Sequence, residues 1–269
     1  MSDASLSRLT SHSHPHIRIL FALVLVLLLS ACSPKDEDRA WEQVQATGVI
    51  RVGMDAAYPP FEDVNDAGDI VGFDVDLARE IGQRLGVNVE FVNIPYDGLY
   101  DALVTGQVEL LVSALVAGWE NEAKANFSIP YFNAGEYLVV PTTSELASMD
   151  EMTGHTLAVE YGSGGDVEAR KWERRLANMT VARYPDPTAA LIAVLDGEAD
   201  AALVDGISAR LGAGQHAELV ARPQESDQLF AIAVGEDSLE LLTQINVILN
   251  DMLQDGTVGA LIDKWFGSQ

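Results

Sequence analysis

The chain has 269 residues, of which 48% are hydrophobic and 21% are charged. This balance is typical of a packed globular protein and excludes an intrinsically disordered chain. The 41 acidic and 16 basic side chains give a formal net charge of -25, which repels nucleic acid and excludes a nucleic-acid-binding role. An acidic excess of this size either favours the capture of cationic solutes or, because the acids are scattered along the chain, serves solubility alone.

The N-terminus has the pattern of a secretory signal. Arg8 and Arg18 precede the uncharged run Ile19–Leu29, which is too short for a membrane-spanning helix of about 20 residues. The following tetrapeptide Leu29–Cys32 (LSAC) resembles the lipobox of bacterial lipoproteins, which implies that residues 1–31 are cleaved and that Cys32 becomes a lipidated first residue. The alternative is an ordinary signal peptide with a chance cysteine. Either way, we expect an extracytoplasmic protein (periplasm or cell surface), and the lipobox reading anchors it to the membrane.

The first half of the mature chain alternates strands with helices. Residues 32–40 are polar and are predicted to form a short tether. Asp74 is predicted to cap a helix that runs to about Leu85, because apolar residues recur there at helical spacing. A second helix is predicted at Gly98–Thr105, and strands are predicted at Val49–Met54, Val87–Ile94 and Leu110–Ala114.

The second half repeats this alternation, which indicates mostly parallel sheets covered on both faces by helices. Strands are predicted at Thr156–Glu160, Thr180–Tyr184 and Ala201–Val204, and helices at Gly165–Leu176, Pro187–Leu195, Leu239–Gln254 and Thr257–Trp265. Two further extended segments, Glu136–Thr142 and Leu229–Val234, are interpreted as crossings between two lobes.

Five blocks of sequence resemble family 3 of the bacterial solute-binding proteins of ABC importers. They are Gly48–Glu62, Ile70–Val87, Phe127–Phe132, Asp196–Asp205 and Asp255–Gly267. The resemblance implies the type II periplasmic-binding-protein fold, with lobe 1 at residues 41–138 and 231–269, lobe 2 at 139–230, and two hinge strands. It also implies that a small solute binds between the lobes, that the lobes close on it, and that an ABC permease is the partner.

Candidate ligand-binding residues in lobe 1 follow the predicted strands, where the ligands of α/β sheets bind. Asp55, Tyr58 and Phe61 come directly after the first strand, Tyr96 after the next, and Ser113 at the end of the third. The resemblance implies that Tyr58 covers one face of the solute and that Asp55 meets a basic group. Packing in the turn is the alternative for Phe61, and a core position capping the next helix is the alternative for Tyr96.

Candidate residues in lobe 2 lie in the glycine turn that contains Ser163 and Gly164, and at Asp205. The turn opens a helix, so its backbone N–H groups are suited to bind a carboxylate. A simple tight connection is the alternative. The resemblance implies that Asp205 accepts a hydrogen bond from the ammonium group of the solute, and its alternative role is to cap the following helix.

One departure from the family pattern concerns the solute itself. Amino-acid-binding relatives carry a Thr or Ser and an Arg that hold the α-carboxylate, whereas alignment places Val116 and Asn121 at these two positions. An amide lacks both the charge and the fork of a guanidinium group. This favours a cationic or polar amine-bearing solute without a dominant α-carboxylate. The alternative, equally supported, is a standard amino acid whose carboxylate rests on Ser163 and the Gly164–Gly165 amides.

Two other functions are open to this fold. One is a periplasmic enzyme similar to cyclohexadienyl dehydratase, with Glu160 or Asp166 as acid, and the other is a ligand-binding sensor module. We expect no cofactor, no metal site and no catalytic residues, since His155 and His216 stand alone in the mature chain.

Overall fold

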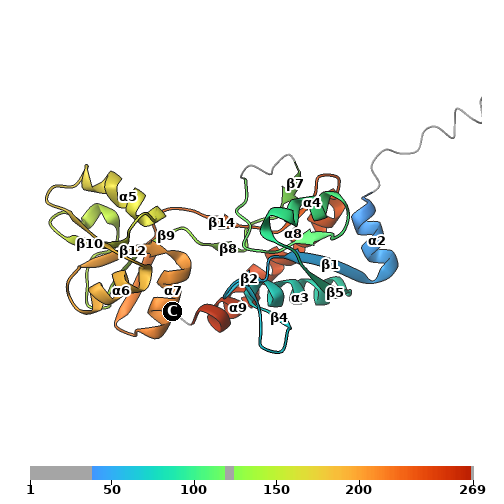
Figure 1. The fold of residues 1–269 in the computed structure, drawn as a ribbon, viewed down its shortest axis with the longest axis horizontal. Coiled ribbons are helices and arrows are strands. Elements are labelled where there is room, and N and C mark those ends of the chain that lie inside the picture. The colour runs from blue at the N-terminus through green and yellow to red at the C-terminus, as the bar shows by residue number, and fades with distance from the viewer. Residues whose placement is uncertain (1–37, 119–123, 268–269) are drawn as a thin grey trace, which may run out of the picture. The chain divides into compact units, whose positions relative to one another are not determined.

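A computed structural model describes residues 38–118 and 124–267 (Figure 1). Cys32 and the expected signal segment lie outside the described residues. The first described element, helix α2 (Arg39–Thr47), was not predicted, and it begins inside the expected tether because the Asp38 side chain accepts a hydrogen bond from the Trp41 backbone N–H. The same carboxylate accepts a second hydrogen bond from the Leu241 N–H, which fixes α2 to the C-terminal part of the chain.

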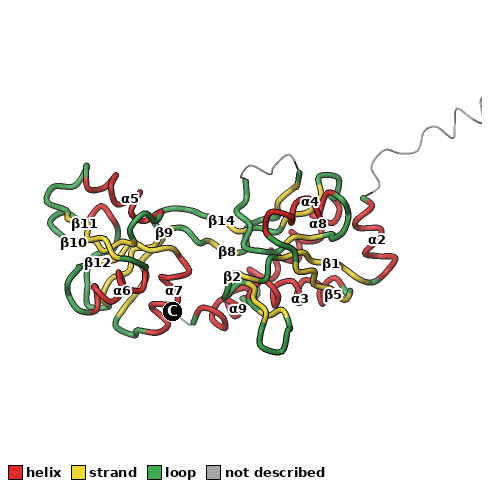
Figure 2. The backbone as a smooth tube through the Cα atoms, in the orientation of Figure 1, coloured by secondary structure: helices red, strands yellow, loops and turns green. Residues whose placement is uncertain are grey.

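The first sheet has five strands in the order β5-β1-β6-β15-β7. Two of these strands, β1 and β5, lie side by side in Figure 2. β1 is parallel to β5 and β6, whereas β15 is antiparallel to β6 and β7. The strands are β1 (Val49–Met54), β5 (Asn88–Asn93), β6 (Leu110–Leu111), β7 (Ala125–Phe127) and β15 (Ala233–Gly235). One face packs against α3 (Phe73–Leu85), α8 (Leu239–Gln254) and α9 (Thr257–Phe266), and the other against α4 (Leu99–Val104), which follows the short helix η1 (Tyr96–Gly98).

The second sheet also has five strands, in the order β11-β10-β12-β9-β13. β10 is parallel to β11 and β12, and β9 is antiparallel to β12 and β13. The strands are β9 (Glu136–Pro141), β10 (Thr156–Glu160), β11 (Thr180–Tyr184), β12 (Ala201–Asp205) and β13 (Leu219–Gln224). Alternate side chains of these strands pack against α6 (Pro187–Leu195) and α7 (Gly206–Gln215) on one face and against α5 (Gly164–Glu173) and η2 (Met149–Glu151) on the other.

Two small sheets complete the fold. β2 (Ala57–Tyr58), β3 (Glu62–Val64) and β4 (Ile70–Val71) form an antiparallel sheet after β1, and β8 (Phe132–Asn133) pairs with β14 (Leu229–Phe230). The chain passes through β8 to the second sheet and returns through β14 to the first. The segment interpreted as the first crossing, Glu136–Thr142, is instead largely β9, a strand inside the second sheet, and Leu229–Val234 divides between β14 and the start of β15. The residue boundaries of the lobes stay a prediction.

The observed bounds of a helix match the predicted bounds closely where the residues at its start are a good cap and a good first turn. The helix Pro187–Leu195 has the predicted bounds because Asp186 caps it and Pro187 occupies its first turn. The predicted cap of α3 is wrong: Gly72 precedes the helix, and the Asp74 side chain is fully buried inside the first turn. Among the described residues, no helix combines the length and the apolarity needed to cross a membrane.

The core under the first sheet contains a cluster of phenylalanine rings with Phe61 at its centre. The Phe61 ring centroid lies 5.1 to 5.8 Å from those of four other rings, which come from α3, β8, β14 and α9: Phe73, Phe132, Phe230 and Phe266. Gly72 permits the close approach of α3, because its φ is 145° and a side chain there would meet the Phe61 backbone. The phenylalanine cluster therefore joins the connecting strands β8 and β14 to the first sheet.

We expect Phe61→Ala to destabilise the protein by about 3 to 5 kcal/mol, because it opens a cavity where five rings meet. The measurement is the free energy of unfolding by denaturant titration. Leu253→Ala, at an exposed position of α8, is the control and should change it by less than about 0.5 kcal/mol. Equal effects of the two substitutions would contradict the central role of Phe61.

Candidate functional site

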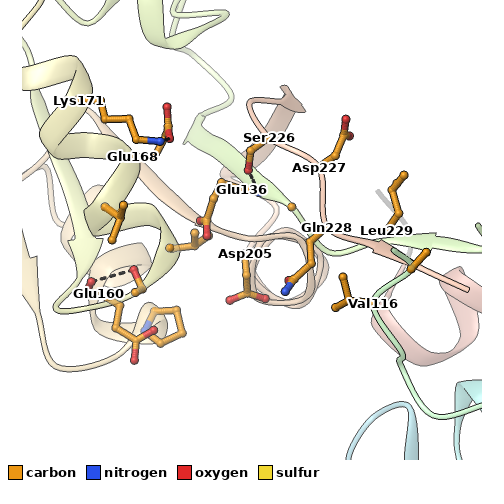
Figure 3. A pocket seen from close by; sticks show the side chains of 17 residues that line it. Val116, Glu136, Glu160, Glu168, Lys171, Asp205, Ser226, Asp227, Gln228 and Leu229 are labelled. Carbon is orange, nitrogen blue, oxygen red and sulfur yellow. Dashed lines mark hydrogen bonds and ion pairs between the residues drawn. The ribbon is translucent and has the colours of Figure 1, made fainter. Parts of the chain in front are cut away.

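A cavity of about 780 Å³ lies at the carboxyl ends of two parallel strands of the second sheet (Figure 3). Glu160 ends β10 and Asp205 ends β12, and both side chains line this large cavity. Ser163 and Gly164 line it from the start of α5. The structure thus brings together the three residues predicted in lobe 2.

A smaller cavity of about 340 Å³ lies at the corresponding ends of β1 and β6 in the first sheet. Four of the residues predicted in lobe 1 line it: Asp55, Tyr58, Tyr96 and Ser113. Val116 and Gln228 line both cavities, so the two groups of predicted residues face adjoining spaces. This is the arrangement expected for the ligand sites of α/β sheets.

Asp55 connects three segments of the small cavity. Its backbone N–H donates to the Ser113 hydroxyl at 3.1 Å, and its carboxylate accepts a hydrogen bond from the Tyr96 N–H at 3.0 Å. Tyr58 and Tyr96 are 46% and 56% exposed, so each ring offers an open face to a solute. Burial raises the pKa of Tyr58, and the carboxylate of Asp205 raises it further.

Phe61 is a correction to the predicted site. Its side chain is fully buried and does not line either cavity. The Tyr58 ring stacks on it with centroids 5.6 Å apart and planes 8° from parallel. Phe61 therefore acts as the support under Tyr58, which is the packing alternative considered for it.

Beneath the small cavity lies a pair of buried carboxyl groups, Glu62 and Asp74. The Ser113 hydroxyl donates to Glu62 at 2.6 Å, and Asp74 accepts hydrogen bonds from the Ala114 N–H and the Tyr131 hydroxyl. Burial, together with the charge of Asp74, raises the pKa of Glu62, and burial also raises the pKa of Asp74. Two charges cannot both be held here without a counterion, so Glu62 keeps a proton.

Two of the predicted residues, Asp205 and Ser163, cap the helices α7 and α5. Asp205 accepts hydrogen bonds from the N–H groups of Ile207 and Ser208, both at 3.0 Å, so the capping alternative is confirmed, while the carboxylate also lines the large cavity. Ser163 caps α5 by accepting from the Asp166 N–H at 3.1 Å. The Asp166 side chain is buried, and although burial opposes ionisation, Arg170, the Gly162 N–H and Arg183 lower its pKa. Asp166 is therefore unsuited to the role of a general acid.

Glu136 was missed by the sequence analysis. It opens β9, lines the large cavity and lies near Asp205 (Figure 3). Burial and the carboxylates of Asp205, Glu160 and Glu168 raise its pKa to about 7, against a hydrogen bond from the Gly165 N–H that lowers it. The only sequence signal for Glu136 was its position as a charged residue at the start of an otherwise apolar strand. Charged residues are common at strand ends, so this signal does not identify a site.

The lining of the large cavity is strongly acidic. Its carboxylates belong to Glu136, Glu160, Glu168, Asp205 and Asp227. Lys171 is the one basic side chain among the described lining residues, and it is paired with Glu168 at 2.6 Å. Asn121 lies outside the described residues, and Val116 presents an apolar side chain where relatives were expected to carry a hydroxyl. Within the described ranges, no cluster of His, Cys, Asp or Glu is arranged to hold a metal ion.

Residues 50–268 match the bacterial extracellular solute-binding proteins, family 3, and the chain belongs to this family. It is 27% identical over 231 residues to the L-cystine-binding protein TcyJ of Escherichia coli (strain K12), which covers 84% of this chain and 85% of that protein. It is 29% identical to a solved ancestral cationic amino acid solute-binding protein, with a TM-score of 0.63 and coverage of 84% and 98%.

The two-lobed fold is also that of the unliganded, open L-cystine solute receptor of Neisseria gonorrhoeae. That structure superposes with a TM-score of 0.75 over 85% of this chain and 97% of the receptor, at 22% identity. The predicted fold class and the predicted class of function, the binding of a small extracytoplasmic solute, are both confirmed.

We expect the buried carboxyl pair to make the protein less stable as the pH rises. A carboxyl whose folded pKa lies above its ordinary value of 4.5 binds its proton more tightly in the folded state. Its contribution to the free energy of unfolding is therefore complete below pH 4.5 and is lost as the pH rises toward the folded pKa. The free energy of unfolding of the wild type should therefore fall between about pH 5 and pH 8, by up to about 1.4 kcal/mol per pH unit for each such proton.

Glu62→Gln should make this fall less steep, because the amide keeps the shape and does not titrate in this range. Denaturant titrations at several pH values measure the slope. Asp63→Asn, which removes an exposed carboxylate from the same strand, is the control. A slope in the Glu62→Gln variant as steep as that of the wild type would contradict the proton assignment.

Proposed function

We propose that the protein is the lipid-anchored solute-binding component of an ABC importer, and that its solute is a small cationic amine. The solute binds across the two adjoining cavities, the lobes close on it, and the closed form delivers it to the permease. The observation that carries this proposal is the lining of the large cavity: among its described residues, five carboxylates face one basic side chain, Lys171, which is already paired.

The physical argument is one of unbalanced charge. Burial disfavours the ionised form of Glu136, and the nearby carboxylate of Asp205 disfavours it further. An ammonium or guanidinium group placed between them would remove the repulsion and gain charge-assisted hydrogen bonds. An anionic solute would find no unpaired basic side chain among the described lining residues.

The small cavity supplies the complementary part of the site. Tyr58 stacks on Phe61 and keeps one ring face open, and a cation over such a face is stabilised by about 0.5 to 2 kcal/mol. Asp55 is held by Ser113 and Tyr96 beside this ring. A solute that contacts both cavities stabilises whichever conformation brings them together, which is the thermodynamic basis of closure. The paired strands β8 and β14 are the proposed hinge.

The alternative solute is a zwitterionic amino acid whose carboxylate rests on Ser163 and the amides of the glycine turn. Mass spectrometry of solute co-purified with the protein, followed by calorimetric titration of amines, betaines and amino acids, separates the two. Tight binding of an ordinary neutral amino acid, with no binding of amines, would refute the cationic class and leave the solute-binding function intact. A dehydratase would need a cation to hold the carboxylates of its substrate, and the described cavity residues include only Lys171.

Asp205→Asn should weaken binding of the tightest amine of that panel by about 10- to 100-fold, since it removes a charge-assisted hydrogen bond. Asparagine is an equally good N-cap, so α7 should stay intact. Isothermal titration calorimetry gives the affinity.

The control is Asp186→Asn, which makes the same change at the N-cap of α6, outside the lining of both cavities. Its affinity for the amine should equal that of the wild type. If both variants bind as the wild type does, Asp205 does not contact the solute.

Lipid anchoring predicts that Cys32→Ala releases the protein from the membrane fraction. The full-length protein should incorporate an alkyne-labelled fatty acid and partition into the detergent phase of Triton X-114, and the variant should do neither. A variant that is exported but still labelled would place the lipid elsewhere, and an unlabelled wild type would identify an ordinary signal peptide.

A further inference from the structure

We propose that Glu136 supplies the protein's own carboxylate at the N-terminus of α5, and thereby fills the position in which a solute carboxylate would bind. The large cavity would then select solutes that carry an ammonium or guanidinium group and lack a neighbouring carboxylate. This inference rests on the proposed solute-binding function and assigns a specificity-determining role to one residue.

The first observation is the contact between Glu136 and the glycine turn. The two carboxylate oxygens lie against Gly164 and Gly165: a Cβ on Gly164 would stand 2.5 Å from Oε1, and one on Gly165 would stand 3.0 Å from Oε2. The absence of side chains at both positions is what lets the carboxylate reach the helix end. The Gly165 N–H lies close enough to this carboxylate to lower the pKa of Glu136.

The second observation is that the other N–H groups of this helix end are already engaged. The Asp166 N–H donates to the Ser163 hydroxyl at 3.1 Å, and the Val167 N–H donates to the Ser163 carbonyl at 3.1 Å. The Gly162 N–H donates to the Asp166 carboxylate. The open N–H groups are therefore those of the Gly164–Gly165 pair, which Glu136 covers.

The third observation is that Glu136 is held in place from its own backbone. Its N–H donates to the Ser226 hydroxyl at 3.1 Å (Figure 3). Its carbonyl accepts a hydrogen bond from the Glu225 N–H at 2.7 Å. Oε2 is buried and has no hydrogen-bond partner among the described residues. The carboxylate thus retains one acceptor without a partner, which is closed to solvent in the empty protein.

The charges around Glu136 act in the same direction. The carboxylates of Asp205, Glu160 and Glu168 face it from β12, β10 and α5. A solute carboxylate entering here would add a further negative charge and would have to displace Glu136 from the Gly165 N–H. A decarboxylated amine would meet neither cost.

The test uses two pairs of probes that differ only by the α-carboxylate: arginine with agmatine, and lysine with cadaverine. Calorimetry on the wild type should show the amine of at least one pair binding at least about tenfold more tightly than its amino acid, the factor expected for one charge-assisted hydrogen bond. Glu136→Ala empties the position, so the amino acid should gain at least about tenfold relative to the amine. Glu136→Gln leaves the position filled, and the gain should be smaller.

The matched control is Glu160→Ala, which removes one carboxylate from the same cavity without touching the glycine turn. It should weaken both members of a pair by a similar factor. If Glu136→Ala does the same, Glu136 is only one more acid facing the cation and the proposal is overturned. A wild type that binds arginine or lysine more tightly than the amine overturns it as well.

A ligand-free measurement separates this inference from the proposed function. The NMR shift of the Gly165 amide should titrate near neutral pH in the wild type and should not do so in Glu136→Gln. A flat Gly165 shift in the wild type, or a titration that survives the substitution, overturns the contact. If no probe binds any variant while Gly165 titrates as expected, the contact stands and the cationic solute class of the proposed function fails.

Discussion

The packing of Phe61 is the contact on which the site depends. Its ring lies among four others from α3, β8, β14 and α9, and its outer face carries the Tyr58 ring. The same few residues therefore hold the connecting strands against the first sheet and set the position of the exposed aromatic of the small cavity. Glu62, the next residue in the chain, is drawn into the interior by this packing and must be stabilised there by Ser113 and by a retained proton.

The second constraint is electrostatic. The protein concentrates carboxylates at the carboxyl ends of β10 and β12 and at the start of β9, where Asp205 and Glu160 disfavour the ionisation of Glu136. Such an arrangement is unfavourable in the empty protein and becomes favourable when a cation enters. The proposed cationic solute class follows from this repulsion, and the glycine turn at α5 determines where one of these carboxylates can rest.

Helix capping and the lining of the large cavity share residues in this protein. Asp205 caps α7 and Ser163 caps α5, and both face the large cavity. A residue that caps a helix at the end of a strand is held rigidly by backbone N–H groups, so its position does not depend on the solute. A substitution of Asp205 or Ser163 can therefore be interpreted as an effect on binding only if the new residue still caps the helix.

The sequence by itself determined the alternation of strands and helices, and the family. Of the nine residues that it predicted to bind the solute, seven line the two cavities. These follow from local periodicity and from positions at strand ends, which are short-range properties. Only the tertiary structure decided that Phe61 is a buried support, that Asp74 is paired with Glu62, and that Glu136 reaches Gly165. Each of these depends on segments far apart in the chain, because burial and the approach of two carboxylates are set by how the sheets and helices pack.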